Sequence, residues 1–154
     1  MQLQTIAFGG YAYSIAKWLP KDVVHHSCPW YGFTDARCRK IAREIVEPTK
    51  VIGFSAGAEA ALRVAWYCPL VREAIIHSVL DNFTKYRRDC VYRFYRTKDD
   101  TTPTFQGTLV SAMLAPSGSS LKTLDMKDFD NPTWFERTQL QRRNHIFHNL
   151  PGLE

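Results

Sequence analysis

The sequence lacks the features that mark membrane-spanning, secreted and disordered proteins. No run of about eighteen apolar residues is present, so no membrane-spanning helix is predicted. The first residues, MQLQTIAFGGY, contain no basic region followed by a long apolar run, which argues against a signal peptide. No low-complexity tract or internal repeat stands out either. These absences predict a cytoplasmic protein that does not associate with membranes.

Cysteine is also scarce, and its spacing argues against two common kinds of stabilising site. The sequence contains no CxxC pair, and its 4 cysteines are scattered at Cys28, Cys38, Cys68 and Cys90. Such spacing indicates reduced thiols, not a disulfide framework or a zinc site. We therefore expect neither a metal nor an organic cofactor.

What is present is an ordinary globular composition with a basic balance. The 154 residues suffice for a single domain over residues 1–154, and 45% of them are hydrophobic and 23% charged. The formal net charge is +5, with basic clusters at 85–88 and 142–143. These clusters are typical of a solvated surface, and they would also suit a preference for anionic substrates or polyanions. No nucleic-acid recognition motif accompanies them, so no specific nucleic-acid partner is expected.

Strand-like and helix-like segments alternate along the chain. Short apolar runs bounded by glycine, proline or polar residues predict strands at 3–8, 22–27, 51–52, 73–80, 90–96 and 121–126. Segments with helical patterning lie between them, at 12–19, 35–46, 58–66 and 105–114. This order predicts an α/β fold, a three-layer α/β/α domain whose mostly parallel central sheet has about five to six strands.

The stretch from Lys50 to Trp66, KVIGFSAGAEAALRVAW, is the centre of the prediction. It has the order strand, sharp turn and alanine-rich helix, with Ser55 at the apex of the turn. Gly53 and Gly57 suit a strained turn, because a Cβ at either position would collide with the neighbouring strand or helix. A plain strand-to-helix turn with an inert serine would give the same pattern.

In this context the pattern Gly53-x-Ser55-x-Gly57 resembles the nucleophile elbow of the α/β-hydrolase fold family. The resemblance implies that Ser55 is a nucleophile whose hydroxyl oxygen attacks an acyl carbonyl. It also implies that the backbone N–H of Ala56, at the start of the following helix, stabilises the oxyanion.

The resemblance extends over nearly the whole chain, from the Gly9–Gly10 turn to the C-terminal histidines. Family members often carry a turn at this place that supplies the second N–H of the oxyanion hole. Here that donor would be Tyr11, or Gly10 if the register slips by one residue. Only a few residues separate Leu80 from Cys90, where most members insert a cap. The resemblance therefore implies a minimal core with an open site.

The acid of a catalytic triad is expected after the second strand beyond the elbow. Residues 96–103 resemble the family pattern G-x-x-D-x-x-x-P with arginine in place of the glycine, which favours Asp99. Asp100 is the adjacent alternative. Asp81 is a more distant one, because some hydrolases place the acid one strand earlier. The same aspartate pair at 99–100 would also suit a turn that caps the next helix.

The base is expected after the last strand, where the sequence offers His145 and His148. Their spacing of three would place both on one face of a helix. The HNLP sequence at 148–151 resembles the segment after the family histidine, which narrowly favours His148 over His145.

Together these residues predict a small serine hydrolase, a carboxylesterase or thioesterase, that works through a Ser-His-Asp triad. Aromatic residues at 11, 30–31 and 134–135 are expected to rim the site. An open, aromatic-rimmed site suits a small acyl substrate or an acyl group carried on a macromolecule. The alternative is a non-catalytic binding module that keeps the scaffold and uses its basic surface. The sequence does not indicate an oligomeric state.

Overall fold

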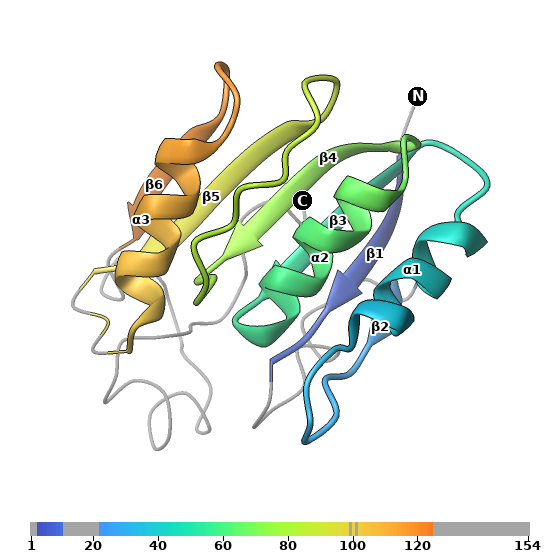
Figure 1. Ribbon diagram of the computed structural model, residues 1–154, viewed down its shortest axis with the longest axis horizontal. Coiled ribbons are helices and arrows are strands. Elements are labelled where there is room, and N and C mark those ends of the chain that lie inside the picture. The colour runs from blue at the N-terminus through green and yellow to red at the C-terminus, as the bar shows by residue number, and fades with distance from the viewer. Residues whose placement is uncertain (1–2, 11–21, 99, 101, 125–154) are drawn as a thin grey trace.

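A six-stranded parallel sheet forms the centre of the computed structural model, which describes residues 3–10, 22–98, 100 and 102–124 (Figure 1). The spatial order is β2-β1-β3-β4-β5-β6, and every neighbouring pair runs parallel. The predicted α/β fold class is confirmed, and the number of strands is as expected. The strands are β1 (Gln4–Phe8), β2 (Val24–His26), β3 (Thr49–Phe54), β4 (Val71–His77), β5 (Val91–Thr97) and β6 (Ser120–Leu124).

The described helices all lie on one face of this sheet (Figure 1). On the opposite face, Ile52 of β3 and Ile75 of β4 are also fully buried, so both faces of the sheet are covered. The helix expected at 12–19 lies outside the described residues. None of the helices in the described part of the chain is long and apolar enough to cross a membrane. The described helices are α1 (Asp35–Glu44), α2 (Ala56–Tyr67) and α3 (Thr104–Leu114).

Small residues on α2 allow the helix to lie close to the sheet. Ala58, Ala61 and Ala65 are fully buried against the strands. Large side chains from the strands complete this core, with Phe8 on β1 and Phe94 on β5 fully buried. Burial of each such large side chain stabilises the fold by about 1.5–3 kcal/mol. The core therefore fixes α2, and the turn that precedes it, against the centre of the sheet.

The strand after α2 ends earlier than the sequence pattern predicts. The apolar run suggests a strand over 73–80, whereas β4 ends at His77. Ser78 then takes a positive φ of 57° and donates its N–H to the carbonyl oxygen of Tyr95 at 2.9 Å. A single residue in this conformation turns the chain away from the sheet, so the apolar residues after it belong to a connection.

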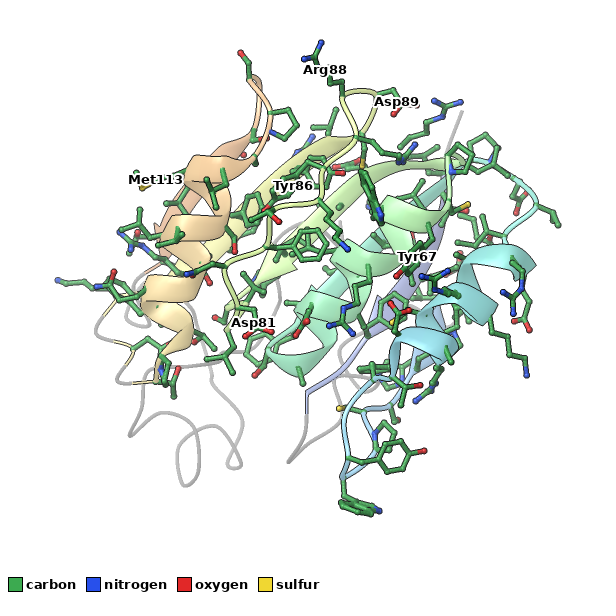
Figure 2. The ribbon with its side chains drawn as sticks, in the orientation of Figure 1. Tyr67, Asp81, Tyr86, Arg88, Asp89 and Met113 are labelled. Carbon is green, nitrogen blue, oxygen red and sulfur yellow. The ribbon has the colours of Figure 1, made fainter. Side chains whose placement is uncertain are left out.

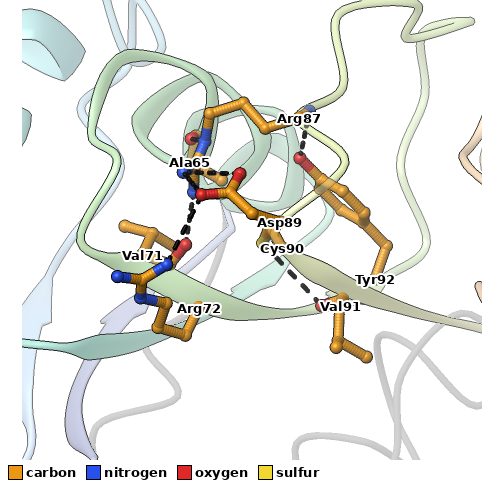
Figure 3. Close-up of polar contacts among 8 residues, drawn as sticks. All are labelled: Ala65, Val71, Arg72, Arg87, Asp89, Cys90, Val91 and Tyr92. Atoms are coloured by element: carbon orange, nitrogen blue, oxygen red, sulfur yellow. Dashed lines mark hydrogen bonds and ion pairs between the residues drawn. The ribbon is translucent and has the colours of Figure 1, made fainter.

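The basic segment after Asn82 contributes to the fold through Arg87. Its Nε donates to the carbonyl oxygen of Ala65 at 2.7 Å, and a second guanidinium nitrogen donates to that of Val71 (Figure 3). Asp89 pairs with the same guanidinium at 3.1 Å. Ala65 lies in the last turn of α2, which has no basic residue of its own. Arg87 therefore supplies the positive charge that stabilises a helix C-terminus.

All four cysteines lie within the described residues and are free thiols. Three of them, Cys38, Cys68 and Cys90, are buried. Burial raises the pKa of Cys38 and that of Cys90 to about 11, which keeps both thiols protonated.

Candidate active site

The predicted site residues that the structure describes follow the ends of neighbouring strands. Because all pairs in the sheet are parallel, the carboxyl ends of these strands meet at one edge, the usual place for a site in an open α/β sheet. Gly10 follows β1, Ser55 follows β3, Asp81 comes four residues after β4, and Asp100 lies three residues after β5. Tyr11, Asp99, His145 and His148 lie outside the described residues.

Ser55 occupies a strained turn between β3 and α2. Its backbone has φ 57° and ψ −118°, a conformation that costs a residue with a Cβ about 1–3 kcal/mol. Its N–H donates to the carbonyl oxygen of His77 at 2.9 Å, and its carbonyl oxygen accepts from the N–H of Ala58 at 2.9 Å. Ser55 stands at the N-cap position of α2, yet its side chain makes no capping hydrogen bond to that helix. Capping is therefore not the role of this side chain.

The two glycines of the motif are required by close packing of backbone on backbone. A Cβ at Gly57 would lie 2.5 Å from the carbonyl carbon of Phe8 and 2.6 Å from the carbonyl oxygen of Gly9. A Cβ at Gly53 would lie 2.7 Å from the Cα of Ala58. These contacts are all with backbone atoms, which cannot move aside as the end of a flexible side chain can. Any substitution at Gly53 or Gly57 would therefore push α2 away from β1 or β3. The strained strand-to-helix turn expected around Ser55, with a close backbone approach at both glycines, is thus present in the structure.

The same packing brings the Gly9–Gly10 turn beside the start of α2. Phe8 and Gly53 are register partners on adjacent strands, and the Gly9 N–H is bonded to the carbonyl oxygen of His26 at 3.1 Å. Ala56 is the first residue of α2, so its N–H is among the donors that have no acceptor within the helix. The two segments expected to form the oxyanion hole are therefore neighbours.

The carboxylate of Asp100 is used by the turn before α3. It is 8% exposed, and its Oδ1 accepts from the N–H of Thr102 at 2.8 Å and from the Thr102 hydroxyl at 2.6 Å. Its Oδ2 accepts from the Thr104 hydroxyl at 2.7 Å. These bonds match the alternative interpretation of the aspartate pair, in which one aspartate organises the turn into the helix.

Asp81 lies in the connection that follows β4 (Figure 2), and burial, followed by the interaction with this side chain, raises the pKa of Glu59 on α2 to about 7. Its backbone carbonyl oxygen accepts from the Ser111 hydroxyl at 2.7 Å. Asp81 and Glu59 both line an open cleft of about 330 Å³ beside α2.

Two of the three described histidines, His26 and His77, are packed against aromatic rings. His77 is 2% exposed and stacks on Tyr95, with ring centroids 4.8 Å apart. On β2, His26 stacks on Phe8 at 5.4 Å. Burial lowers the pKa of both His25 and His26, and the nearby Arg37 guanidinium lowers that of His26 further. These two imidazoles are therefore mainly neutral at pH 7.

Two residues that the structure places near the elbow were not among those predicted from the sequence. Ser78 shares with Ser55 a positive φ of 57°, but it is 2% exposed. Nothing in the sequence distinguishes it from a strand residue. Glu59 forms an i,i+4 pair with Arg63, which the helical spacing could have suggested. It lines one cleft with Asp81, and no local pattern predicts that arrangement.

Comparison by sequence identifies no relative of this chain. No family model matches it, and neither does any curated protein.

Comparison by structure finds similar folds at low sequence identity. A protein assigned as a thioesterase from Silicibacter sp. has a TM-score of 0.56 and 10% identity over 79% of this chain and 66% of its own. RedJ, solved with a polyethylene glycol molecule in its active site, has a TM-score of 0.59 and 12% identity over 80% of both chains. The esterase domain of a Rhodothermus marinus protein has a TM-score of 0.58 and 14% identity over 79% of this chain and 76% of its own.

These similarities concern the fold. The chain spans just under two thirds of the length of the Silicibacter protein, at 66%. The three neighbours share the parallel α/β architecture that carries the strained serine here. The chain therefore has an α/β-hydrolase-like fold, the fold of these thioesterase and esterase structures.

Proposed function

We propose that this chain is a small serine hydrolase that cleaves an acyl ester or thioester through an acyl-enzyme. The observation that carries the proposal is the backbone of Ser55, held at φ 57° and ψ −118° between β3 and α2. Backbone strain of this kind clusters at active sites, where the surrounding structure offsets its cost. The fold shared with thioesterase and esterase structures supports the same class of reaction.

In this mechanism Ser55 needs a base, because its hydroxyl is essentially un-ionised at neutral pH. His148, or His145 in its place, accepts the hydroxyl proton as Oγ attacks the acyl carbonyl carbon. It then gives that proton to the departing alkoxide or thiolate. Asp99 orients the imidazole and stabilises its charged form. We favour Asp99 because the Asp100 carboxylate accepts three hydrogen bonds from Thr102 and Thr104.

The tetrahedral intermediate carries a negative oxygen that needs two N–H donors. The N–H of Ala56 is one donor, and that of Tyr11, or Gly10, is the other. Support comes from Gly57, whose packing against Phe8 and Gly9 holds the two segments together. Water then attacks the acyl-enzyme carbonyl, the imidazole takes its proton, and the acid leaves as Ser55 regains its hydrogen.

The aromatic turn after β2 supports a substrate that extends beyond the site. Trp30 is 89% exposed and Tyr31 60% exposed, and the two rings pack edge to face at 5.4 Å. They follow the carboxyl end of β2, the sheet edge at which β3 also ends. The connection at 78–90 contains no helix or strand that could act as a cap. An acyl group on a larger carrier would therefore meet little obstruction in the described part of the chain.

The alternative, a binding module that uses a basic surface, has less support. Many arginines on the described surface are engaged in ion pairs with acidic side chains. The pairs are Arg39–Asp35, Arg63–Glu59, Arg72–Asp89, Arg87–Asp89 and Arg93–Glu73. Charges neutralised in this way offer a weaker field to a polyanion.

Covalent labelling with a fluorophosphonate, followed by intact mass, tests the proposal. We expect one adduct on the wild type and none on Ser55→Ala. We also expect none on whichever of His148→Ala and His145→Ala removes the base. Ser78→Ala is the matched control, because it replaces the other described serine with a positive φ, and it should label as the wild type does. Absence of any adduct on folded wild type would overturn the proposal and favour the binding module.

A further inference from the structure

The face of α3 that lies against the rest of the protein carries small and polar residues. The Thr108 hydroxyl donates to the carbonyl oxygen of Val79 at 3.2 Å, and the Ser111 hydroxyl donates to that of Asp81 at 2.7 Å. Hydrogen bonds, and not large apolar side chains, therefore hold this helix on the connection that follows β4. The buried residues of α3 are Thr104, Gly107, Thr108 and Ser111.

Gly107 shows why this face is small. A Cβ at this position would lie 2.6 Å from the carbonyl carbon of Leu80 and 2.7 Å from the carbonyl oxygen of Val79. Both atoms belong to the backbone, so the helix lies too close to the connection for a side chain to fit between them. The larger residues of α3 must therefore point elsewhere.

The large apolar residues of α3 lie on its outer side. Leu109, Val110 and Met113 have the spacing of one helix face, and this face is opposite to the buried residues of α3. Met113 is 74% exposed and lies on the outer side of the helix in Figure 2, and Leu114 is 52% exposed. A surface helix normally has the reverse arrangement, with its apolar stripe against the core.

This outer face also carries no charge. From Pro103 to Leu121 the sequence contains no charged residue, although 23% of the whole chain is charged. The guanidinium of Arg96, on the neighbouring β5, lies 4.1 Å from the centre of the Phe105 ring and donates to the Thr123 hydroxyl at 2.9 Å, so it is engaged within the chain. The outer side of α3 is therefore a neutral, apolar surface on a protein with a net charge of +5.

We propose that the outer face of α3 binds a second copy of this chain, with α3 packed against the same helix of the partner across a two-fold axis. In such an isologous contact the same patch faces itself, so a charged patch would meet its own sign. Two copies with a net charge of +5 repel each other, and this repulsion is least where the surface is neutral. Helix α3 and β6 form one end of the layered structure, and no other helix or strand of the described part lies beyond them (Figure 1). A second copy can therefore approach α3 directly.

A lipid surface fits this face less well. Helices that lie in a membrane interface combine an apolar face with lysine and arginine on the polar face, and α3 has no basic residue. The same lack of charge gives a strongly acidic or basic partner nothing to pair with. A second copy needs neither kind of group, because the same uncharged apolar residues are present on both sides of the contact.

The proposed contact is small. A stable interface buries about 800 Å² on each partner, and a single helix of 11 residues provides only part of this area. We therefore expect a weak dimer, with a Kd on the order of 10 µM. Because the contact is apolar and the two chains repel through their net charge, added salt should strengthen the dimer.

Sedimentation velocity at protein concentrations from about 1 to about 200 µM tests the proposal. We expect the wild type to change from monomer to dimer across this range. Met113→Lys places like charges on the two facing helices, so its Kd should rise about tenfold or more. Met113→Leu keeps the apolar surface and should dimerise as the wild type does.

Val46→Lys is the matched control. Val46 is 84% exposed and follows α1, which lies at the other end of the row of helices (Figure 1). This substitution adds the same charge away from α3, so the dimer should persist. Both substituted residues are exposed, so urea unfolding should be nearly unchanged in each variant. A wild type that stays monomeric throughout, or a dimer that Met113→Lys weakens no more than Val46→Lys does, would overturn the proposal.

Two further results would assign the face to a different occupant. A dimer that weakens as salt is added would be held by charges and not by α3. Flotation of the monomer with vesicles of phosphatidylcholine alone, lost in Met113→Lys, would mean that the face binds a lipid surface. Either result would contradict the proposal. None of these measurements uses catalytic activity, so their outcome is independent of the proposed function.

Discussion

The N–H of Ser55 donates to the carbonyl oxygen of His77 at 2.9 Å, which ties the elbow to the end of the neighbouring strand. The His77 ring in turn stacks on Tyr95 of β5, with an interplanar angle of 13°. Phe54, the residue before Ser55, lies on the other side of His77 with ring centroids 6.3 Å apart. The turn that carries Ser55 therefore rests on a row of rings across three strands.

This row predicts that His77 is needed for packing and not for proton transfer. Replacement by alanine leaves a cavity among Phe54 and Tyr95, and we expect it to destabilise the fold by about 3 kcal/mol. His77→Phe keeps a planar ring of similar size and should cost less than half as much. Urea denaturation measures both values. A His77→Phe variant that folds but no longer reacts with a fluorophosphonate would show that the imidazole takes part in the chemistry.

Gly57→Ala tests the close approach of α2 to β1. The added Cβ would lie 2.5 Å from the carbonyl carbon of Phe8, so the helix start must move. We expect destabilisation of about 3 kcal/mol and a large loss of Ser55 labelling, because the two expected oxyanion donors separate. Thermal unfolding and the rate of fluorophosphonate labelling measure the two effects.

Gly118→Ala is the control for a general effect of removing glycine. Gly118 has a positive φ of 98°, but a Cβ there would have no heavy atom within 4 Å. We expect a cost of about 1 kcal/mol from the backbone alone and a normal labelling rate. If Gly57→Ala labels as fast as Gly118→Ala, the packing of α2 against β1 does not shape the site.

Arg87→Ala tests the anchoring of the other end of α2. The Arg87 side chain is 13% exposed and donates to the carbonyl oxygens of Ala65 and Val71 (Figure 3). Removing it leaves both acceptors without this donor, and we expect a loss of about 2–3 kcal/mol. Arg87→Lys should recover only part, because an ammonium group cannot reproduce the planar guanidinium geometry.

Arg88→Ala provides the comparison at the neighbouring position. Arg88 is exposed and points away from the body of the molecule (Figure 2). Its removal lowers the net charge by the same amount but should change stability by less than about 0.5 kcal/mol. Equal effects of the two substitutions, measured by urea unfolding, would mean that net charge and not the anchoring bonds stabilises this segment.

The sequence was sufficient for the features that depend on local patterning. Apolar runs predict the strands because a parallel strand buried on both faces excludes polar residues. Threonine is a residue type that favours the N-cap position, and the hydroxyl of Thr34, just before the helix expected at 35–46, accepts a hydrogen bond from the N–H of Arg37 at 3.2 Å. The spacing of Gly53 and Gly57 predicts the strained serine between them, because few other arrangements require both glycines.

Features that depend on distant contacts could not be predicted in this way. The basic segment at 85–88 suggests a solvated surface, whereas Arg87 binds backbone carbonyls of α2 and β4. Its role depends on residues that are 22 and 16 positions away. Glu59 on α2 and Asp81 in the connection after β4 likewise line one cleft although they are distant in sequence. The predicted roles of Asp99, His145 and His148 stay predictions, because these residues lie outside the described part.

The two adjacent aspartates after β5 should separate stability from catalysis. In Asp100→Asn an amide replaces the carboxylate that faces the Thr102 N–H and the Thr104 hydroxyl. The amide NH2 group cannot accept a hydrogen bond, so one of these two bonds is lost. We expect a loss of about 1–2 kcal/mol in stability with the fluorophosphonate adduct retained. Asp99→Asn should show the reverse, with near-normal urea unfolding and a strongly reduced labelling rate, because the histidine loses the charge that orients it. If Asp100→Asn abolishes labelling while Asp99→Asn does not, the acid is Asp100, and the bonds to Thr102 and Thr104 then hold a catalytic carboxylate in place.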